Sequence, residues 1–210
     1  QNDELKATFI FVSDVDTLSI YQYRVLDIFP LKAQMVRQIK LSSTSEGCVA
    51  DDESGILYFA QEDDQSGIYY IHTDPNKSEI GVIDRTVKYG GNIIGDTEGL
   101  AILKHENNKF LFASSQGSSD FVIYDLNNKR KFLGRITIVK SKNIDGVSRT
   151  DGIEIFGGKL NDDFPLGIFI AQDDMNMEIF NLGEETLQAK KVNQNFKLMS
   201  IESIIEEFID

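Results

Sequence analysis

Apolar residues occur along this chain in short runs that are separated by polar, turn-forming segments. The clearest series of apolar runs covers residues 48–50, 56–60, 68–71 and 80–83. The segments between these runs are rich in Gly, Pro, Asn, Asp and Ser, which end β-strands and form turns. The pattern therefore predicts four β-strands between residues 45 and 85.

The same unit recurs further along the chain, and part of it also precedes the first complete copy. The predicted units cover residues 5–41, 45–85, 96–139 and 150–199. The earliest of them has only the last three strands of a unit. Within the last unit, strands are predicted at 153–156, 167–171 and 178–180. Helical spacing of apolar residues is almost absent before the C-terminus, where it predicts one short helix over 200–208.

An acidic residue followed by glycine opens each complete unit. These acidic-glycine steps are Glu46-Gly47, Glu98-Gly99 and Asp151-Gly152. A repeat that returns one carboxylate to the same place in successive units gathers negative charges in space. Gathered carboxylates need a cation, and the oxygen ligands that they offer are those that calcium prefers. The steps therefore predict calcium binding.

The spacing of about 50 residues between the steps is typical of β-propeller blades. We therefore predict an all-β fold, a single partial β-propeller domain over residues 1–210 with three to four blades of four antiparallel strands. A β-sandwich is the alternative, but it would not explain the repeated carboxylate. An incomplete ring leaves two sheet faces exposed. We expect them to be covered by further blades of a longer chain, by a second copy in a homodimer, or by another partner.

Charge and composition narrow the range of partners. The chain has 34 acidic and 21 basic residues and a net charge of -13. Because nucleic acids are bound by clustered Lys and Arg, this charge argues against a nucleic-acid partner. No apolar run approaches the roughly 18 residues of a membrane span, so no membrane partner is expected. The single cysteine, Cys48, cannot form an internal disulfide and is expected to be a buried strand residue.

Nine sequence motifs, spread over nearly the whole chain, occur in the same order as in a known protein family. They lie at residues 44–53, 61–63, 82–85, 96–100, 113–117, 145–148, 150–153, 164–173 and 193–198. By these motifs the chain resembles the β-propeller phytases, calcium-dependent phosphatases that act on phytate, inositol hexakisphosphate. The resemblance covers the C-terminal half or more of the family's six-bladed domain, and it implies a secreted or periplasmic protein.

The resemblance assigns the repeated carboxylates to a catalytic centre with several calcium ions. It implies that Glu46, Glu98 and Asp151 are catalytic. The calcium ligands that it implies at this centre are Glu46, Glu62, Asp96, Glu98 and Asp151. Bound calcium ions bridge phosphate oxygens and lower the pKa of an attacking water. They also reverse the negative charge that would otherwise repel phytate.

A second, structural calcium site is implied in the last blade. Its implied ligands are Asp145, Asp173 and Asn176. Two residues of this region depart from the family, since Met175 replaces an acidic residue and Arg149 stands where the family usually has Asp. Arg149 is predicted to bind substrate phosphate directly, because a guanidinium group can donate two hydrogen bonds to one phosphate.

Other phosphatase chemistries lack their characteristic residues. Cys48 is followed six positions later by Ser54 and not by Arg, so the cysteine-phosphatase loop is absent. His72 and His105 lack the Arg-His-Gly context of histidine acid phosphatases and are expected on the surface. Any phosphatase activity is therefore predicted to depend on metal.

Two functions stay open at this point. The first is calcium-dependent hydrolysis of phytate phosphomonoesters by a metal-activated water. The second is an incomplete, non-catalytic propeller domain that binds calcium or a phosphorylated ligand and assists a complete phytase domain. The second is motivated by residues 13–16, which replace a family segment whose Lys contacts phosphate, and by the missing first blades.

Overall fold

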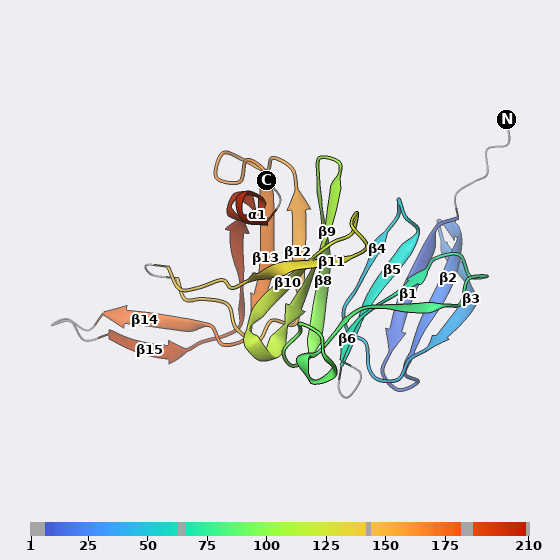
Figure 1. Ribbon diagram of the computed structural model, residues 1–210, viewed down its shortest axis with the longest axis horizontal. Coiled ribbons are helices and arrows are strands. Elements are labelled where there is room, and N and C mark those ends of the chain that lie inside the picture. The colour runs from blue at the N-terminus through green and yellow to red at the C-terminus, as the bar shows by residue number, and fades with distance from the viewer. Residues whose placement is uncertain (1–6, 63–65, 142–143, 182–186, 209–210) are drawn as a thin grey trace.

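The computed structural model describes residues 7–62, 66–141, 144–181 and 187–208. Over these residues the regular secondary structure is almost entirely antiparallel β-sheet, which confirms the predicted all-β class (Figure 1). Short 3₁₀ turns span Val87–Tyr89 and Gln116–Ser118, and the α-helix α1 spans Glu202–Phe208. No helix within the described ranges is long and apolar enough to cross a membrane.

Four sheets follow one another along the chain. The first sheet contains β1 (Phe9–Asp14), β2 (Ser19–Ile28) and β3 (Leu31–Lys40). The second contains β4 (Cys48–Asp51), β5 (Ile56–Gln61), β6 (Gly67–His72) and β7 (Ile80–Arg85). The third contains β8 (Thr97–His105), β9 (Asn108–Ser115), β10 (Asp120–Asp125) and β11 (Lys131–Ile136). The fourth contains β12 (Ile153–Gly157), β13 (Gly167–Asp173) and β16 (Asn195–Ser200).

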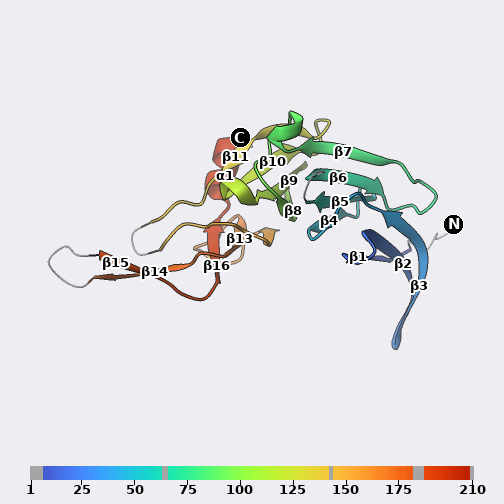
Figure 2. The ribbon, with the colours of Figure 1, turned by 90° about the horizontal axis from the view of Figure 1, so that it is seen from below.

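The four sheets are arranged in an open arc. Figure 2 shows β1, β4 and β8 on the inner side of this arc. The first strands of neighbouring sheets touch there, since β8 contacts both β4 and β12. Three hydrophobic clusters fill the interfaces between the first and second, second and third, and third and fourth sheets. The helix α1 packs into the last of these clusters.

The central strands are apolar on both faces because each inner sheet is covered on both sides. In β5, Leu57 and Phe59 join the cluster shared with the first sheet, whereas Tyr58 and Ala60 join the cluster shared with the third sheet. Successive side chains of a strand point to opposite faces, which explains this division. The strand β9 divides its residues in the same way between the second and fourth sheets.

The fourth sheet differs from its sequence-based prediction. The segment 178–180 was expected to be its third strand, but it lies in β14 (Met177–Asn181), which pairs with β15 (Leu187–Lys191). The strand β16 takes the place beside β13 instead. The β14–β15 hairpin extends away from the four sheets (Figure 1).

The prediction of a buried Cys48 is also wrong. Cys48 begins β4, and its side chain is exposed. The strand β4 is an edge strand with one neighbour, β5, in its sheet. Its residues are therefore less covered than those of the central strand, and Cys48 is not part of any of the three hydrophobic clusters.

The glycines of the acidic-glycine steps lie where consecutive sheets touch. A Cβ atom on Gly47 would lie 2.1 Å from the backbone oxygen of Glu98, and one on Gly99 would lie 2.8 Å from the backbone oxygen of Asp151. Each glycine thus allows its step to pack against the step of the next sheet. A Cβ on Gly152 would meet no described atom within 4 Å, so the last step lacks such a neighbour in the described part of the chain.

Candidate functional site

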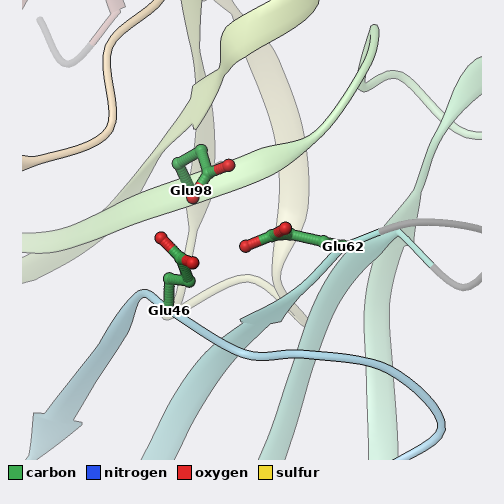
Figure 3. Close-up of side chains that lie close together, drawn as sticks. All are labelled: Glu46, Glu62 and Glu98. Atoms are coloured by element: carbon green, nitrogen blue, oxygen red, sulfur yellow. The ribbon is translucent and has the colours of Figure 1, made fainter. Parts of the chain in front are cut away.

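Three glutamates bring their carboxylates together between the second and third sheets. Glu46 lies just before β4, Glu62 just after β5 and Glu98 within β8. One carboxylate oxygen from each residue lies within 4.8 Å of the other two. Figure 3 shows the three side chains converging on one region. We refer to Glu46, Glu62 and Glu98 as the glutamate cluster.

Backbone hydrogen bonds place Glu46 next to Glu62. The backbone N–H of Ala60 donates to the oxygen of Gly47 (2.8 Å), and that of Glu62 donates to the oxygen of Thr44 (3.1 Å). The segment that leads into β4 therefore runs beside the end of β5. Because β5 is held on its other side by β6, this pairing fixes both glutamates to the second sheet.

A β-bulge presents Glu98 from the third sheet. The pairing of β8 with β9 shifts its register between Thr97 and Leu100, so one extra residue is accommodated at Glu98 and Gly99. Bulges change the direction of a side chain relative to its strand. The N–H of Gly99 also donates to the backbone oxygen of Asp151 (2.7 Å), which ties this bulge to the step of the fourth sheet.

Burial and negative charge act together on Glu98. The residue is only 5% exposed, and its Oε2 atom has no hydrogen-bond partner within the described ranges. Burial, followed by the charges of Glu62, Glu46, Asp151 and Asp96, raises the pKa of Glu98 to about 8. Without a compensating positive charge, the protonated form of Glu98 is therefore favoured near neutral pH.

The glutamate cluster fits a hard divalent cation. Its ligand atoms are carboxylate oxygens, which suit calcium and magnesium better than soft metals. The buried Oε2 of Glu98 is a polar atom that a bound cation would satisfy. A cation there would also favour the ionised form of Glu98 and reduce the repulsion among the three carboxylates.

Asp96 and Asp151 lie near this cluster without belonging to its closest group. Both contribute to the raised pKa of Glu98. The Oδ1 atom of Asp151 accepts a hydrogen bond from Gln116 Nε2 (2.7 Å), and its backbone N–H donates to Gln172 Oε1 (3.0 Å). The third acidic-glycine step is therefore oriented by two glutamine side chains. The catalytic role of Asp151 and the ligand role of Asp96 stay predictions.

Arg149 lies two residues before Asp151 at an exposed position. Its backbone has a positive φ of 47°, and its N–H donates to Ser119 Oγ (3.1 Å). This left-handed conformation is uncommon for a residue other than glycine. The guanidinium group is accessible to a ligand, and its predicted role in binding phosphate stays a prediction.

The three ligands expected for a structural calcium ion lie together, but a lysine lies among them. The Nζ atom of Lys197 is 2.7 Å from Asp145 Oδ1 and 3.1 Å from Asp173 Oδ2. It also donates to Asn176 Oδ1 and to Asn195 Oδ1, each at 2.9 Å. Asp173 is fully buried, and Lys197 is only 8% exposed. We refer to Lys197, Asp145, Asp173, Asn176 and Asn195 as the lysine cluster.

The remaining oxygens of the two aspartates are also engaged. Asp145 Oδ2 accepts a hydrogen bond from the Met177 N–H (2.5 Å). Asp173 Oδ1 accepts from both the N–H and the Oγ of Ser148 (3.0 Å each). Burial raises the pKa of Asp145, but the hydrogen bonds from Lys197 and the Met177 N–H, with the lysine charge, hold that pKa below its usual value.

Sequence reasoning did not assign a role to Lys197 or to Gln116. Both lie in recognised motifs, at 193–198 and 113–117, yet neither motif indicates what its polar side chain contacts. The two carboxylate partners of Lys197 are distant in sequence, with Asp145 more than 50 positions away. A lone lysine in an apolar segment gives no local signal of these contacts, so sequence reasoning had no means of finding them.

These observations define a class of protein: an all-β chain of successive antiparallel sheets with a carboxylate cluster, suited to a divalent cation, where two of the sheets meet. The chain belongs to the phytase family, because the family's sequence profile, described as Phytase, matches residues 17–210. It is similar to the 3-phytase of Bacillus subtilis (strain 168), with 38% identity over 189 residues. The similarity covers 88% of this chain and 46% of that relative, so the chain spans about half of the relative's length.

Proposed function

We propose that this chain is part of a β-propeller phytase that hydrolyses phosphomonoesters of phytate with several calcium ions. The observation that carries the proposal is the glutamate cluster, whose three carboxylates approach within 4.8 Å of one another. Membership of the phytase family and the similarity to a protein named 3-phytase support the substrate class. The preference of calcium for carboxylate oxygens supports the choice of ion.

The charge of the protein and of the substrate makes a cation necessary at this site. Phytate is a polyanion, the chain has a net charge of -13, and four further carboxylates act on Glu98. Phosphate groups would be repelled from this surface unless positive charge were supplied. Bound calcium supplies that charge and lowers the pKa of the water that attacks phosphorus.

The chain's own residues divide the remaining work. Glu46, Glu62 and Glu98 hold the cation at the junction of the second and third sheets. Gln116 holds the carboxylate of Asp151 in a fixed orientation beside that junction, through the 2.7 Å hydrogen bond. Arg149 is exposed and close in sequence to Asp151, so its guanidinium donates to a phosphate group of the bound substrate.

In this proposal, further blades at the open ends of the arc complete the propeller ring. The packing of the glycines in the acidic-glycine steps supports this arrangement. Gly47 and Gly99 pack against the step of the following sheet, whereas a Cβ atom on Gly152 would have no described atom within 4 Å. The last sheet also exposes large apolar side chains, namely Phe156, Phe196 and Leu198.

The completing blades come from a longer chain or from a second copy. A dimer in sedimentation at micromolar concentration would favour the second copy, and a monomer would exclude it.

Phosphate release from phytate tests the catalytic proposal. Release should require calcium, and Glu98→Gln should reduce it at least about 1,000-fold by removing the buried ligand charge. Glu79→Gln, at an exposed position away from the cluster, is the matched control and should retain the parent rate. Unchanged release by Glu98→Gln would remove Glu98 from the proposed site.

The second candidate function is calcium and phosphorylated-ligand binding without catalysis, in support of a complete phytase domain. It is favoured by the open packing position at Gly152. Calorimetric titration with calcium and phytate, alongside the release assay, separates the two functions. Binding without turnover, even after the missing blades are added, would favour the second. Turnover that requires the glutamate cluster would favour the first.

A further inference from the structure

The expected structural calcium site already contains a positive charge from the protein itself. Four side-chain oxygens surround Lys197 Nζ at 2.7 to 3.1 Å, two from carboxylates and two from amides. The three shorter distances, to Asp145, Asn176 and Asn195, are ordinary for charge-assisted hydrogen bonds from an ammonium group. The 3.1 Å contact to Asp173 Oδ2 is an ion pair without a hydrogen bond. The buried carboxylate of Asp173, which could not remain ionised alone at low cost, is therefore compensated within the protein.

The geometry of the lysine cluster does not fit a calcium ion. Calcium takes six to eight oxygen ligands at about 2.3–2.6 Å, and the space between these oxygens holds the Lys197 ammonium group. The other carboxylate oxygens, Asp145 Oδ2 and Asp173 Oδ1, are not free to bind calcium. They already accept hydrogen bonds from the Met177 N–H and from Ser148. A divalent ion could enter only if Lys197 left and these bonds rearranged.

We propose that the Lys197 ammonium group is the resident cation of the lysine cluster and takes the place expected for structural calcium. Lys197 comes from β16, Asp173 from the end of β13, Asp145 from the connection before β12, and Asn176 from the turn before β14. The ammonium group thus links four segments without a metal. Ser148, bonded to Asp173, is next to Arg149, so the cluster also fixes the segment that leads to Asp151.

Calcium titration of a variant without the glutamate cluster tests this proposal. In Glu46→Gln/Glu62→Gln the lysine cluster is intact, and we expect neither calcium binding at the lysine cluster by calorimetry nor a calcium-dependent rise in the melting temperature from that site. Asp145→Asn is then added to the same variant. If residual calcium binding is present and Asp145→Asn removes it, calcium binds at the lysine cluster and the proposal is wrong. If Asp145→Asn leaves the titration unchanged, the proposal stands.

Removal of the lysine charge gives the reciprocal test. Lys197→Met leaves Asp145 and Asp173 without their cation, and we expect the melting temperature in EDTA to fall by about 10 °C. Millimolar calcium should recover part of this fall. The matched control is Lys190→Met, at an exposed position of β15, which should melt within about 2 °C of the parent. A Lys197→Met protein that melts like the parent in EDTA would overturn the proposal, and if it does not fold, the calcium titration decides.

Discussion

The glutamate cluster and the lysine cluster each contain a buried acidic residue, Glu98 and Asp173, yet their electrostatic states are opposite. In the glutamate cluster, burial and neighbouring carboxylates raise the pKa of Glu98 to about 8. In the lysine cluster, burial also raises the pKa of Asp145, but Lys197 and the Met177 N–H outweigh it, and the net pKa is lowered. The difference is the presence of a cationic side chain.

This difference indicates a structural role for the lysine cluster and a ligand-binding role for the glutamate cluster. The lysine cluster is electrostatically compensated by the fold, so it gains little from an ion from solution. Glu98 Oε2 and Asp173 Oδ2 both lack a hydrogen-bond partner within the described residues, but Asp173 Oδ2 has the Lys197 ammonium group at 3.1 Å. The neighbouring charges that act on Glu98 are carboxylates instead. Such perturbed groups are typical of functional sites. The comparison therefore favours the glutamate cluster over the lysine cluster as the site of the proposed calcium.

Reversal of the charge at the centre of the lysine cluster should have the largest effect. Lys197→Glu replaces the only cation of this cluster by a third carboxylate, beside a fully buried Asp173. We expect a loss of more than about 5 kcal/mol in the free energy of unfolding in EDTA, since even loss of one partner of a buried ion pair costs about 3–5 kcal/mol. Urea unfolding measures this loss. A protein as stable as the parent would show that the cluster contributes little to the fold.

The pH dependence of stability should report the uncompensated charge of Glu98. Its pKa is about 8 in the folded protein and 4.5 in the reference state, so between these values the folded protein binds more protons than the unfolded chain. The contribution of protonated Glu98 to the free energy of unfolding is therefore fully present below pH 4.5. It is lost as the pH rises to about 8. The full pKa shift of Glu98 corresponds to at most about 5 kcal/mol in the free energy of unfolding, and solvent screening reduces this value.

Urea unfolding in EDTA at several pH values between 5 and 8 measures this dependence. Glu98→Gln is the reference, because its amide cannot ionise and keeps nearly the same shape. The parent should lose stability relative to Glu98→Gln as the pH rises, and calcium should remove that relative loss. Parallel pH curves for the two proteins would contradict the raised pKa of Glu98.

Introduction of a lysine into the glutamate cluster should make it resemble the lysine cluster. Glu46 is the exposed member, so Glu46→Lys can be accommodated without burying a new charge. We expect the calcium affinity to fall at least about 100-fold, or roughly 3 kcal/mol, because one ligand is lost and a positive charge is gained. Glu79→Lys changes the net charge equally and is the control for long-range effects. Equal affinities of the two variants would place calcium elsewhere.

The strand content of the sheets could be read from the sequence, but the pairing of the last strands could not. Apolar runs between turns identify β5 and β9, which are buried on both faces. The run at 178–180 has the same appearance, yet it pairs with β15 in a separate hairpin. Alternation along one strand specifies which face is apolar and not which strand lies beside it, so sequence alone could not favour β16 as the neighbour of β13.

The sites were predictable to the extent that their residues repeat. Glu46 and Glu98 could be found because the acidic-glycine step recurs, and the close contact of Gly47 with the Glu98 backbone explains why glycine follows the acid. Lys197 has no repeat, and its burial depends on contacts with residues that are far away in sequence. Charged residues are rarely buried, so a strand lysine gives no local indication that it is a counter-ion.

The smallest effect should come from the hydroxyl group that supports the lysine cluster from outside. Ser148→Ala removes the hydrogen bond from Oγ to Asp173 Oδ1 but keeps the bond from the backbone N–H. We expect a loss of about 1 to 2 kcal/mol, the usual range for one hydrogen bond to a charged group. Because Lys197 remains as the cation, this loss should be the same in EDTA and in calcium. A loss that calcium reverses would mean that a metal ion competes for Asp173, and the distinction between the two clusters would fail.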